Sequence, residues 1–414
     1  MIIDSLEYNG KCSCGREHQM VTEFSVIENG CIFKLNEYLN KFGLNGFAVA
    51  VYDENTYKAT NDRHPKVDCE VILDSYDLHA NEHGVELLKS KLPDEAAVLI
   101  AIGSGTVHDI TRYCAYEKNI DFVSCPTAAS VDGFCSSVAA MTWKGSKKTL
   151  TAVAPKFVLA DLDIIKKAPL YLAKSGFGDM IGKYIALSDW KIGNVLTGEF
   201  YCEKIATMTK DATEAVLKSA DGIINGDENA YEKLMYGLLL SGLAMQMMGN
   251  SRPASGAEHH ISHIIEMHPE GLNANSGALH GEKVGVGTLI AIGEYHRIAN
   301  MTNITWKDYK EFSKEYIYDM FGERLTGEIL DENKNDSAHG ITAELLEKSF
   351  PEIKNIINEI PTEDELKKIY QKLGIKSTLE DIDVSADKIK LLLDYSPCVR
   401  NRLTFMRLRR CTSI

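Results

Sequence analysis

Short runs of apolar residues alternate with amphipathic stretches through the first 165 residues. The runs are rich in β-branched or small side chains and are bounded by turn residues, a pattern typical of strands buried on both faces of a parallel sheet. They lie at 47–52, 71–73, 96–102, 122–124 and 156–160. The pattern therefore predicts an α/β, Rossmann-like parallel-sheet domain over residues 1–165.

The pattern changes after Ala168 and Pro169, where long segments with helical periodicity replace the short apolar runs. The clearest of them cover 203–220, 230–248 and 284–299. Thr362, which is followed by acidic residues, and Ser385 are typical helix N-caps. We expect a second, all-α domain over residues 166–414. The chain length of 414 residues agrees, because one hydrophobic core seldom grows that large.

The excess of acidic over basic residues limits which molecules this protein can bind. The chain has 45 Lys and Arg against 59 Asp and Glu, a formal net charge of -14, which repels nucleic acid and anionic lipid. We therefore expect no nucleic-acid or membrane partner, and an anionic substrate would need local Lys or Arg side chains. No basic, apolar leader is present at the N-terminus and no uncharged apolar segment approaches about 18 residues, so the expected location is cytoplasmic.

Ten cysteines are scattered along the chain without a compact framework, which predicts free thiols. Cys12, Cys14 and His18 lie close together in the sequence CSCGREH at 12–18. Together they offer three metal donors, one fewer than a closed tetrahedral structural site requires. The sequence alone therefore does not favour a metal site there.

A glycine turn follows the predicted strand 96–102. The segment GSGTVHD at 103–109 leads from that strand into a helical stretch, the order that places backbone N–H groups and a helix N-terminus on a pyrophosphate. A dinucleotide fits this position. The third glycine of the usual fingerprint is replaced by His108, and an ordinary tight turn explains the segment equally well.

A second loop, SCPTAASVDG at 124–133, follows the next predicted strand and has small and hydroxyl side chains that allow a ligand to approach. Carboxyl ends of parallel strands share one edge of the sheet, so both loops should lie there. Asp53 follows the strand 47–52, where a carboxylate can accept hydrogen bonds from a ribose and favour NAD over NADP. A helix-capping role for Asp53 is at least as common.

Histidines gather in the predicted helical domain. On a helix His259 and His263 are four residues apart and share a face, whereas His260 is rotated by about 100°. With His280 from the next helix, two or more imidazoles can clasp a divalent metal. A further ligand is needed, and Asp179 in SGFGDMIGK at 175–183 is the best available carboxylate, because its flanking glycines allow close packing. A helix cap is the alternative role for Asp179.

These residues resemble the superfamily of iron-containing alcohol dehydrogenases and dehydroquinate synthases. The most specific motif is NSRPASGAEHHISH at 250–263 followed by HGEKVGVG at 280–287, and it is most similar to that of the bacterial branch of the sn-glycerol-1-phosphate dehydrogenases. The similarity extends from Cys12 to Leu403. It implies a dehydroquinate synthase-like fold and NAD- or NADP-linked, metal-dependent chemistry.

The resemblance also implies roles for individual residues. One divalent metal, zinc or nickel, would be bound by Asp179, His259 and His280, with His263 near the substrate as a proton relay. Asp132 would contact the substrate hydroxyls and take part in catalysis. The nicotinamide cofactor would be held by Gly103, Ser104, Gly105, Asp109, Thr127 and Ser130. His260 departs from the family, which usually has an apolar residue after the metal ligand.

The predicted reaction is the reversible reduction of dihydroxyacetone phosphate to sn-glycerol 1-phosphate. Arg252 and the pair Lys147 and Lys148 are candidate phosphate ligands, although a solvated surface is an equally good explanation for the two lysines. A glycerol or other small-polyol dehydrogenase is the main alternative, and a dehydroquinate synthase-like lyase is a weaker one. Members of this family usually pair, so a homodimer or higher homo-oligomer is expected.

Overall fold

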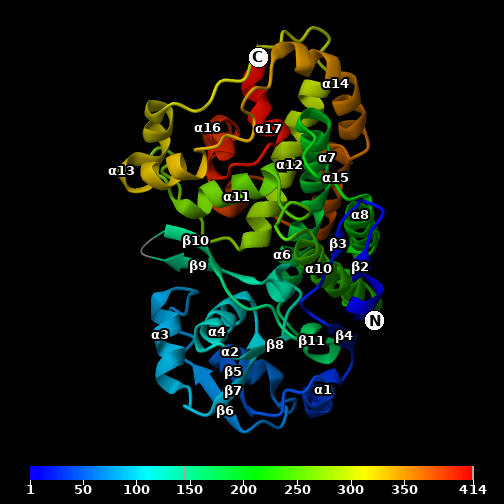
Figure 1. Cartoon of the computed structure of the whole chain (residues 1–414), viewed down its shortest axis with the longest axis vertical. Coiled ribbons are helices and arrows are strands. Elements are labelled where there is room, and N and C mark those ends of the chain that lie inside the picture. Colours follow the sequence, from blue (N-terminus) through cyan, green and yellow to red (C-terminus); the bar gives the residue numbers. More distant parts are fainter. Residues whose placement is uncertain (144–145, 413–414) are drawn as a thin grey trace. The chain divides into compact units, whose positions relative to one another are not determined.

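The computed structural model describes residues 1–143 and 146–412, without the side chains of residues 146 and 147. The chain forms two compact units (Figure 1). The sheet unit consists of Met1–Met180 and Glu214–Asn250, and the helical unit of Ile181–Thr213 and Ser251–Ile414. The predicted boundary after residue 165 differs from this division. Residues 214–250 belong to the sheet unit because helix α10 (Glu228–Met248) packs against its strand β4 and helix α5.

The described part of the sheet unit contains one seven-stranded sheet in the order β1-β4-β11-β8-β7-β5-β6. All neighbouring strands are parallel except β1, which runs antiparallel to β4. The strands are β1 (Ile2–Asp4), β4 (Phe24–Glu28), β5 (Phe47–Asp53), β6 (Cys69–Leu73), β7 (Ala96–Gly103), β8 (Asp121–Pro126) and β11 (Phe157–Asp161). The five predicted strands are therefore confirmed, and β1 and β4 complete the sheet. Two hairpins accompany it, β2 (Gly10–Lys11) with β3 (Glu17–His18) and β9 (Val138–Trp143) with β10 (Ser146–Thr151).

Both faces of the sheet are buried, which explains why its strands read as continuous apolar runs. In β7, Val98 and Ile100 pack on one face with α1 (Leu35–Lys41) and α5 (Leu162–Ile165). Leu99 and Ala101 pack on the other with α3 (Glu82–Lys91) and α4 (Gly105–Lys118). The remaining helices of this unit are α2 (Glu54–Thr60), α9 (Ala220–Ile224) and nearly all of α6 (Leu170–Ile181).

The strand order determines where a ligand can bind. The chain places β6 on one side of β5 and then β7, β8 and β11 in succession on the other, so the direction of winding reverses between β5 and β7. In such sheets ligands bind at the carboxyl ends of the strands beside this reversal. Val51 of β5 is in register with Ala101 of β7, and Gly103 is in register with Pro126 of β8. The loops after these strands therefore meet at one edge.

The helical unit is built around the pair α11 (Ala257–Met267) and α12 (His280–Ala299). The helical segments predicted at 203–220 and 284–299 are confirmed as α8 (Glu203–Lys218) and α12, and the one predicted at 230–248 is α10 of the sheet unit. Thr362 caps α15 through a capping box with Glu365. The other helices are α7 (Lys183–Thr197), α13 (Lys314–Glu332), α14 (Ala343–Asn358), α15 (Glu363–Leu373), α16 (Ile389–Tyr395) and α17 (Phe405–Leu408). Within the described ranges, no helix is both long and apolar enough to cross a membrane.

Candidate active site

The glycine turn connects β7 to α4 as the sequence predicts. Gly103 ends β7, and a Cβ atom there would lie 2.6 Å from the nearest side-chain atom of Val107, so a larger residue would displace the first turn of the helix. Ser104 is the N-cap of α4 but makes no side-chain capping bond. The first N–H groups of α4 are therefore suited to bind an anion such as a phosphate.

His108 explains why the third glycine of the usual fingerprint is absent. Its ring is buried, with Nδ1 2.9 Å from the carbonyl oxygen of Ser104 and Nε2 2.8 Å from Oγ of Ser124 on β8. Burial, reinforced by the nearby Arg112 guanidinium, lowers the pKa of His108 to about 3. The neutral ring therefore ties the glycine turn to the neighbouring strand.

The other predicted cofactor residues lie at the same edge or close to it. The backbone N–H of Thr127 donates to the carbonyl of Gly103 at 3.0 Å, which joins the two loops directly. Asp53 ends β5, and its Oδ1 caps α2 by accepting from the N–H of Thr56 at 2.7 Å. Asp109 lies in the second turn of α4, with its carboxylate 3.8 Å from Nε of Arg112. A role for these side chains in cofactor binding stays a prediction.

Asp132 and Asp179 are brought together within the sheet unit, although 47 residues separate them. The fully buried carboxylate of Asp179 accepts from the backbone N–H of Asp132 at 3.0 Å, and Oδ2 of Asp132 accepts from Ser241 Oγ at 2.8 Å. A Cβ atom on Gly176 would lie 2.1 Å from the carbonyl oxygen of Ala129. This glycine lets α6 approach the loop closely.

Asp179 does not cap a helix N-terminus. It lies near the end of α6, where Gly182 in a helical conformation connects α6 to α7. A buried carboxylate is costly unless a cation or hydrogen-bond donors compensate it. This setting favours the predicted role as a metal ligand.

Three imidazoles converge in the helical unit. His259 and His263 lie one turn apart on α11, and His280 begins α12. The ring centroid of His280 is 5.4 Å from that of His259 and 5.9 Å from that of His263. The i, i+4 spacing predicted this shared face, and the α11–α12 packing adds the third ring.

Two carboxylates orient these rings. Nδ1 of His259 is 2.6 Å from Oε1 of Glu258, and Nδ1 of His280 is 2.9 Å from Oε1 of Glu266. Partners of this kind hold the proton on Nδ1 and direct the lone pair of Nε2 toward a metal. Burial raises the pKa of Glu258 to about 7. Burial opposes ionisation of Glu266 as well, but His280 and Lys283 outweigh it and hold the pKa of that carboxyl well below its usual range.

The cluster differs in one respect from the predicted ligand set. His263, Glu266 and His280 each offer a donor atom, and these atoms lie within 4.8 Å of one another. Glu266 was not among the predicted site residues, although its spacing of three residues from His263 and seven from His259 places it on the same helix face. His260 is fully buried elsewhere, and its ring nitrogens have no hydrogen-bond partner among the described residues. Its rotation away from the cluster agrees with the helix geometry.

The candidate phosphate ligands differ in how far their side chains are buried and paired. The buried guanidinium of Arg252 forms a two-pronged contact with Glu199, both distances 2.8 Å, and donates to the carbonyls of Asp189 and Leu403. These contacts favour a structural role, and phosphate binding by Arg252 stays a prediction. Lys148 is half-buried on β10, and the side chain of Lys147 lies outside the described residues.

The sheet unit carries a glycine turn suited to a dinucleotide, and the helical unit carries an imidazole–carboxylate cluster suited to a divalent metal. The family model for iron-containing alcohol dehydrogenases matches residues 26–169. A probable glycerol dehydrogenase from Sinorhizobium meliloti superposes with a TM-score of 0.60 at 18% identity, covering 92% of this chain and 90% of that one. An iron-containing alcohol dehydrogenase from Corynebacterium glutamicum gives 0.57 at 14% identity, covering 92% and 89%. These two structures support the fold.

Curated relatives with similar sequences identify the family more specifically. A glycerol-1-phosphate dehydrogenase [NAD(P)+] from Bacillus licheniformis is 31% identical over 410 residues, which cover 96% of this chain and 92% of that protein. One from Geobacillus stearothermophilus is 32% identical, covering 96% and 94%. The archaeal enzyme of Pyrococcus horikoshii is 32% identical over 70% of this chain and 81% of its own length. The chain belongs to the glycerol-1-phosphate dehydrogenase family of the iron-containing alcohol dehydrogenase superfamily.

Proposed function

We propose that this enzyme catalyses the reversible, NAD(P)H-linked reduction of dihydroxyacetone phosphate to sn-glycerol 1-phosphate. The names of the full-length relatives support the activity and the cofactor. The observation that carries the proposal is the cluster of His259, His263 and His280 with its orienting carboxylates, in a chain that also has a dinucleotide-type glycine turn.

Asp179, His259 and His280 would hold the divalent metal. The donor set fits, because two imidazoles are oriented through Nδ1 and Asp179 is a buried carboxylate near the end of α6. When bound, the metal would polarise the ketone and stabilise the developing alkoxide by several kcal/mol. Imidazole and carboxylate ligands accept zinc, nickel or iron. We propose zinc or nickel, and the metal content of the purified enzyme distinguishes the two.

The sheet unit would bind the nicotinamide cofactor through the helix α4. Its first-turn N–H groups would bind the pyrophosphate, with Gly103 and Gly105 allowing the backbone to approach it. Asp53 at the end of β5 would accept hydrogen bonds from a ribose, which favours NAD over NADP. The cofactor supplies the hydride, and these residues position it.

The remaining residues would orient the substrate and move its proton. Asp132, held by Ser241, would accept a hydrogen bond from a substrate hydroxyl. His263 lies beside both predicted histidine ligands and would pass a proton to the product oxygen. Lys148, with Lys147 as a further candidate, would counter the substrate phosphate in a chain whose overall charge is negative. Arg252 could do so only by releasing its contacts with Glu199.

A chiral assay tests the proposal most directly. The purified enzyme is incubated with NADH, zinc or nickel and dihydroxyacetone phosphate, and the stereochemistry of the glycerol phosphate is determined. We expect the sn-1 isomer and a large preference for the phosphorylated ketone over dihydroxyacetone. Formation of the sn-3 isomer, or equal turnover of the two ketones, would refute the proposed substrate and point to a general polyol dehydrogenase. A cytoplasmic location and a homo-oligomeric state stay predictions.

A further inference from the structure

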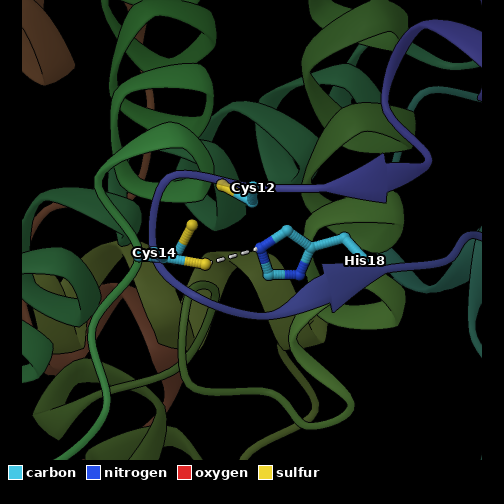
Figure 2. A group of neighbouring side chains, drawn as sticks. Cys12, Cys14 and His18 are labelled. Carbon is cyan, nitrogen blue, oxygen red and sulfur yellow. Dashed lines mark hydrogen bonds between the residues drawn. The ribbon is translucent and has the colours of Figure 1, made fainter.

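The N-terminal hairpin holds a second group of metal donors, separate from the residues of the proposed reaction. Cys12 follows β2, Cys14 lies in the turn, and His18 ends β3 (Figure 2). Sγ of Cys14 is 3.2 Å from Nε2 of His18, and the donor atoms of the three residues all lie within 4.8 Å of one another. We propose that Cys12, Cys14 and His18 bind a structural zinc ion.

The hairpin backbone creates this convergence. The N–H of Cys12 donates to the carbonyl of Arg16 at 2.9 Å, and the N–H of Gly15 donates to the carbonyl of Cys12 at 3.0 Å. Gly15 has a φ of 85°, a left-handed conformation that glycine adopts without strain. The chain therefore reverses within the CSCG segment, and the pairing of Gly10 with His18 returns the histidine to the cysteines.

The histidine is already held in the form that a metal requires. Its Nδ1 is 2.9 Å from the carbonyl oxygen of Met247, near the end of α10, and only a protonated Nδ1 can donate to a carbonyl. Nε2 therefore carries the lone pair and faces Cys14. This is the usual arrangement of a metal-bound imidazole, in which the other ring nitrogen donates to an orienting acceptor.

The donor types and spacing select zinc. Thiolates are soft ligands and imidazole is a borderline one, and a set of two thiolates and one imidazole suits a tetrahedral zinc ion. With Zn–S near 2.3 Å and Zn–N near 2.0–2.1 Å, neighbouring donor atoms of a tetrahedral site are separated by about 3.4–3.8 Å. This value lies between the 3.2 Å that separates Cys14 Sγ from His18 Nε2 and the upper limit of 4.8 Å for the donor atoms. Binding would release the thiol protons to solvent. The fourth position is available to water or a further side chain.

The ion would fasten the N-terminal segment to the sheet unit. Strands β2 and β3 each have only two residues, and a short isolated hairpin has little stability of its own. Beyond His18, the side-chain carbonyl of Gln246 accepts from the N–H groups of Val21 and Thr22, so the same end of α10 anchors the following segment. Zinc would stabilise this connection by binding only the folded hairpin.

The metal content of the full-length protein tests the proposal. Zinc per chain is measured by inductively coupled plasma mass spectrometry in the wild type and in the double variant Cys12→Ser/Cys14→Ser. Cys69→Ser is the matched control, because Cys69 is a half-buried thiol outside any described cluster. His280→Ala removes a predicted ligand of the catalytic metal and leaves the hairpin intact.

We expect the double variant to lose one bound zinc per chain and to melt at a lower temperature, whereas Cys69→Ser keeps the wild-type content. His280→Ala should retain the hairpin zinc. Unchanged zinc in the double variant, or a Cys12–Cys14 disulfide in freshly purified wild-type protein, would overturn the proposal. If the double variant does not fold, cobalt substitution of the wild type decides: a thiolate-to-cobalt charge-transfer band supports the site, and its absence refutes it.

Discussion

Glu266→Gln tests whether the carboxylate behind His280 orients the catalytic metal site. The side chain is about nine-tenths buried, and its Oε1 is 2.9 Å from Nδ1 of His280. A hydrogen bond to a charged group contributes about 1.5–3 kcal/mol, against about 0.5–1.5 kcal/mol for a neutral one. Glutamine keeps an acceptor oxygen but loses the charge, so the expected loss is about 1–2 kcal/mol, which corresponds to about a 5–30-fold weaker metal affinity.

The assay separates metal binding from chemistry. The enzyme is stripped with a chelator and titrated with buffered zinc or nickel, following both calorimetric heat and NADH oxidation with dihydroxyacetone phosphate. We expect a weaker metal affinity in Glu266→Gln, with kcat largely recovered at saturating metal. Glu347→Gln, an exposed carboxylate on α14, serves as the control. An unchanged metal affinity, or a loss of kcat that excess metal does not restore, would show that Glu266 does not act through His280.

Three further changes test the roles of buried polar side chains. Burial lowers the pKa of His108, so below about pH 6.5 the unfolded chain binds a proton that the folded chain does not, and the free energy of unfolding falls. The wild type should therefore lose about 2 kcal/mol between pH 7.5 and pH 5 through this residue, and His108→Gln should not. Urea unfolding at the two pH values measures the difference, and an equal pH dependence in both proteins would contradict it. Arg252→Lys cannot form the two-pronged contact with Glu199, so the melting temperature should fall while the KM for dihydroxyacetone phosphate stays within about twofold; a rise of about tenfold would instead support phosphate binding. Asp336→Ala leaves the fully buried guanidinium of Arg407 without its partner at 2.7 Å and should cost about 3–5 kcal/mol in urea unfolding, whereas a cost below about 1 kcal/mol would show that the remaining hydrogen bonds suffice.

The sequence predicted the sheet well because its signals are local. Five strands buried on both faces appear as apolar runs, and the glycine turn directly follows one of them. Strand β1 was missed because it has only three residues, and β4 because Ser25 interrupts its apolar run; the places of both in the sheet depend on pairing with distant segments. The predicted domain boundary differed for the same reason, because α10 returns to the sheet unit after an excursion through the helical unit.

In the candidate site, too, some features follow from local sequence and others only from tertiary packing. Helical periodicity alone placed His259 and His263 on one face and turned His260 away, since both follow from 3.6 residues per turn. His280 was also predicted from the sequence, but its distance from the other two rings, the orienting carboxylate of Glu266 and the contact of Asp179 with the loop at Asp132 came from the packing of the helices. The contacts of Arg252, and the carbonyl of Met247 that orients His18, likewise arise from chain segments that meet only after folding. Residue types and local spacing determined the available chemistry. Only the tertiary structure, through burial and long-range contacts, decided which donors meet and which charges are already paired.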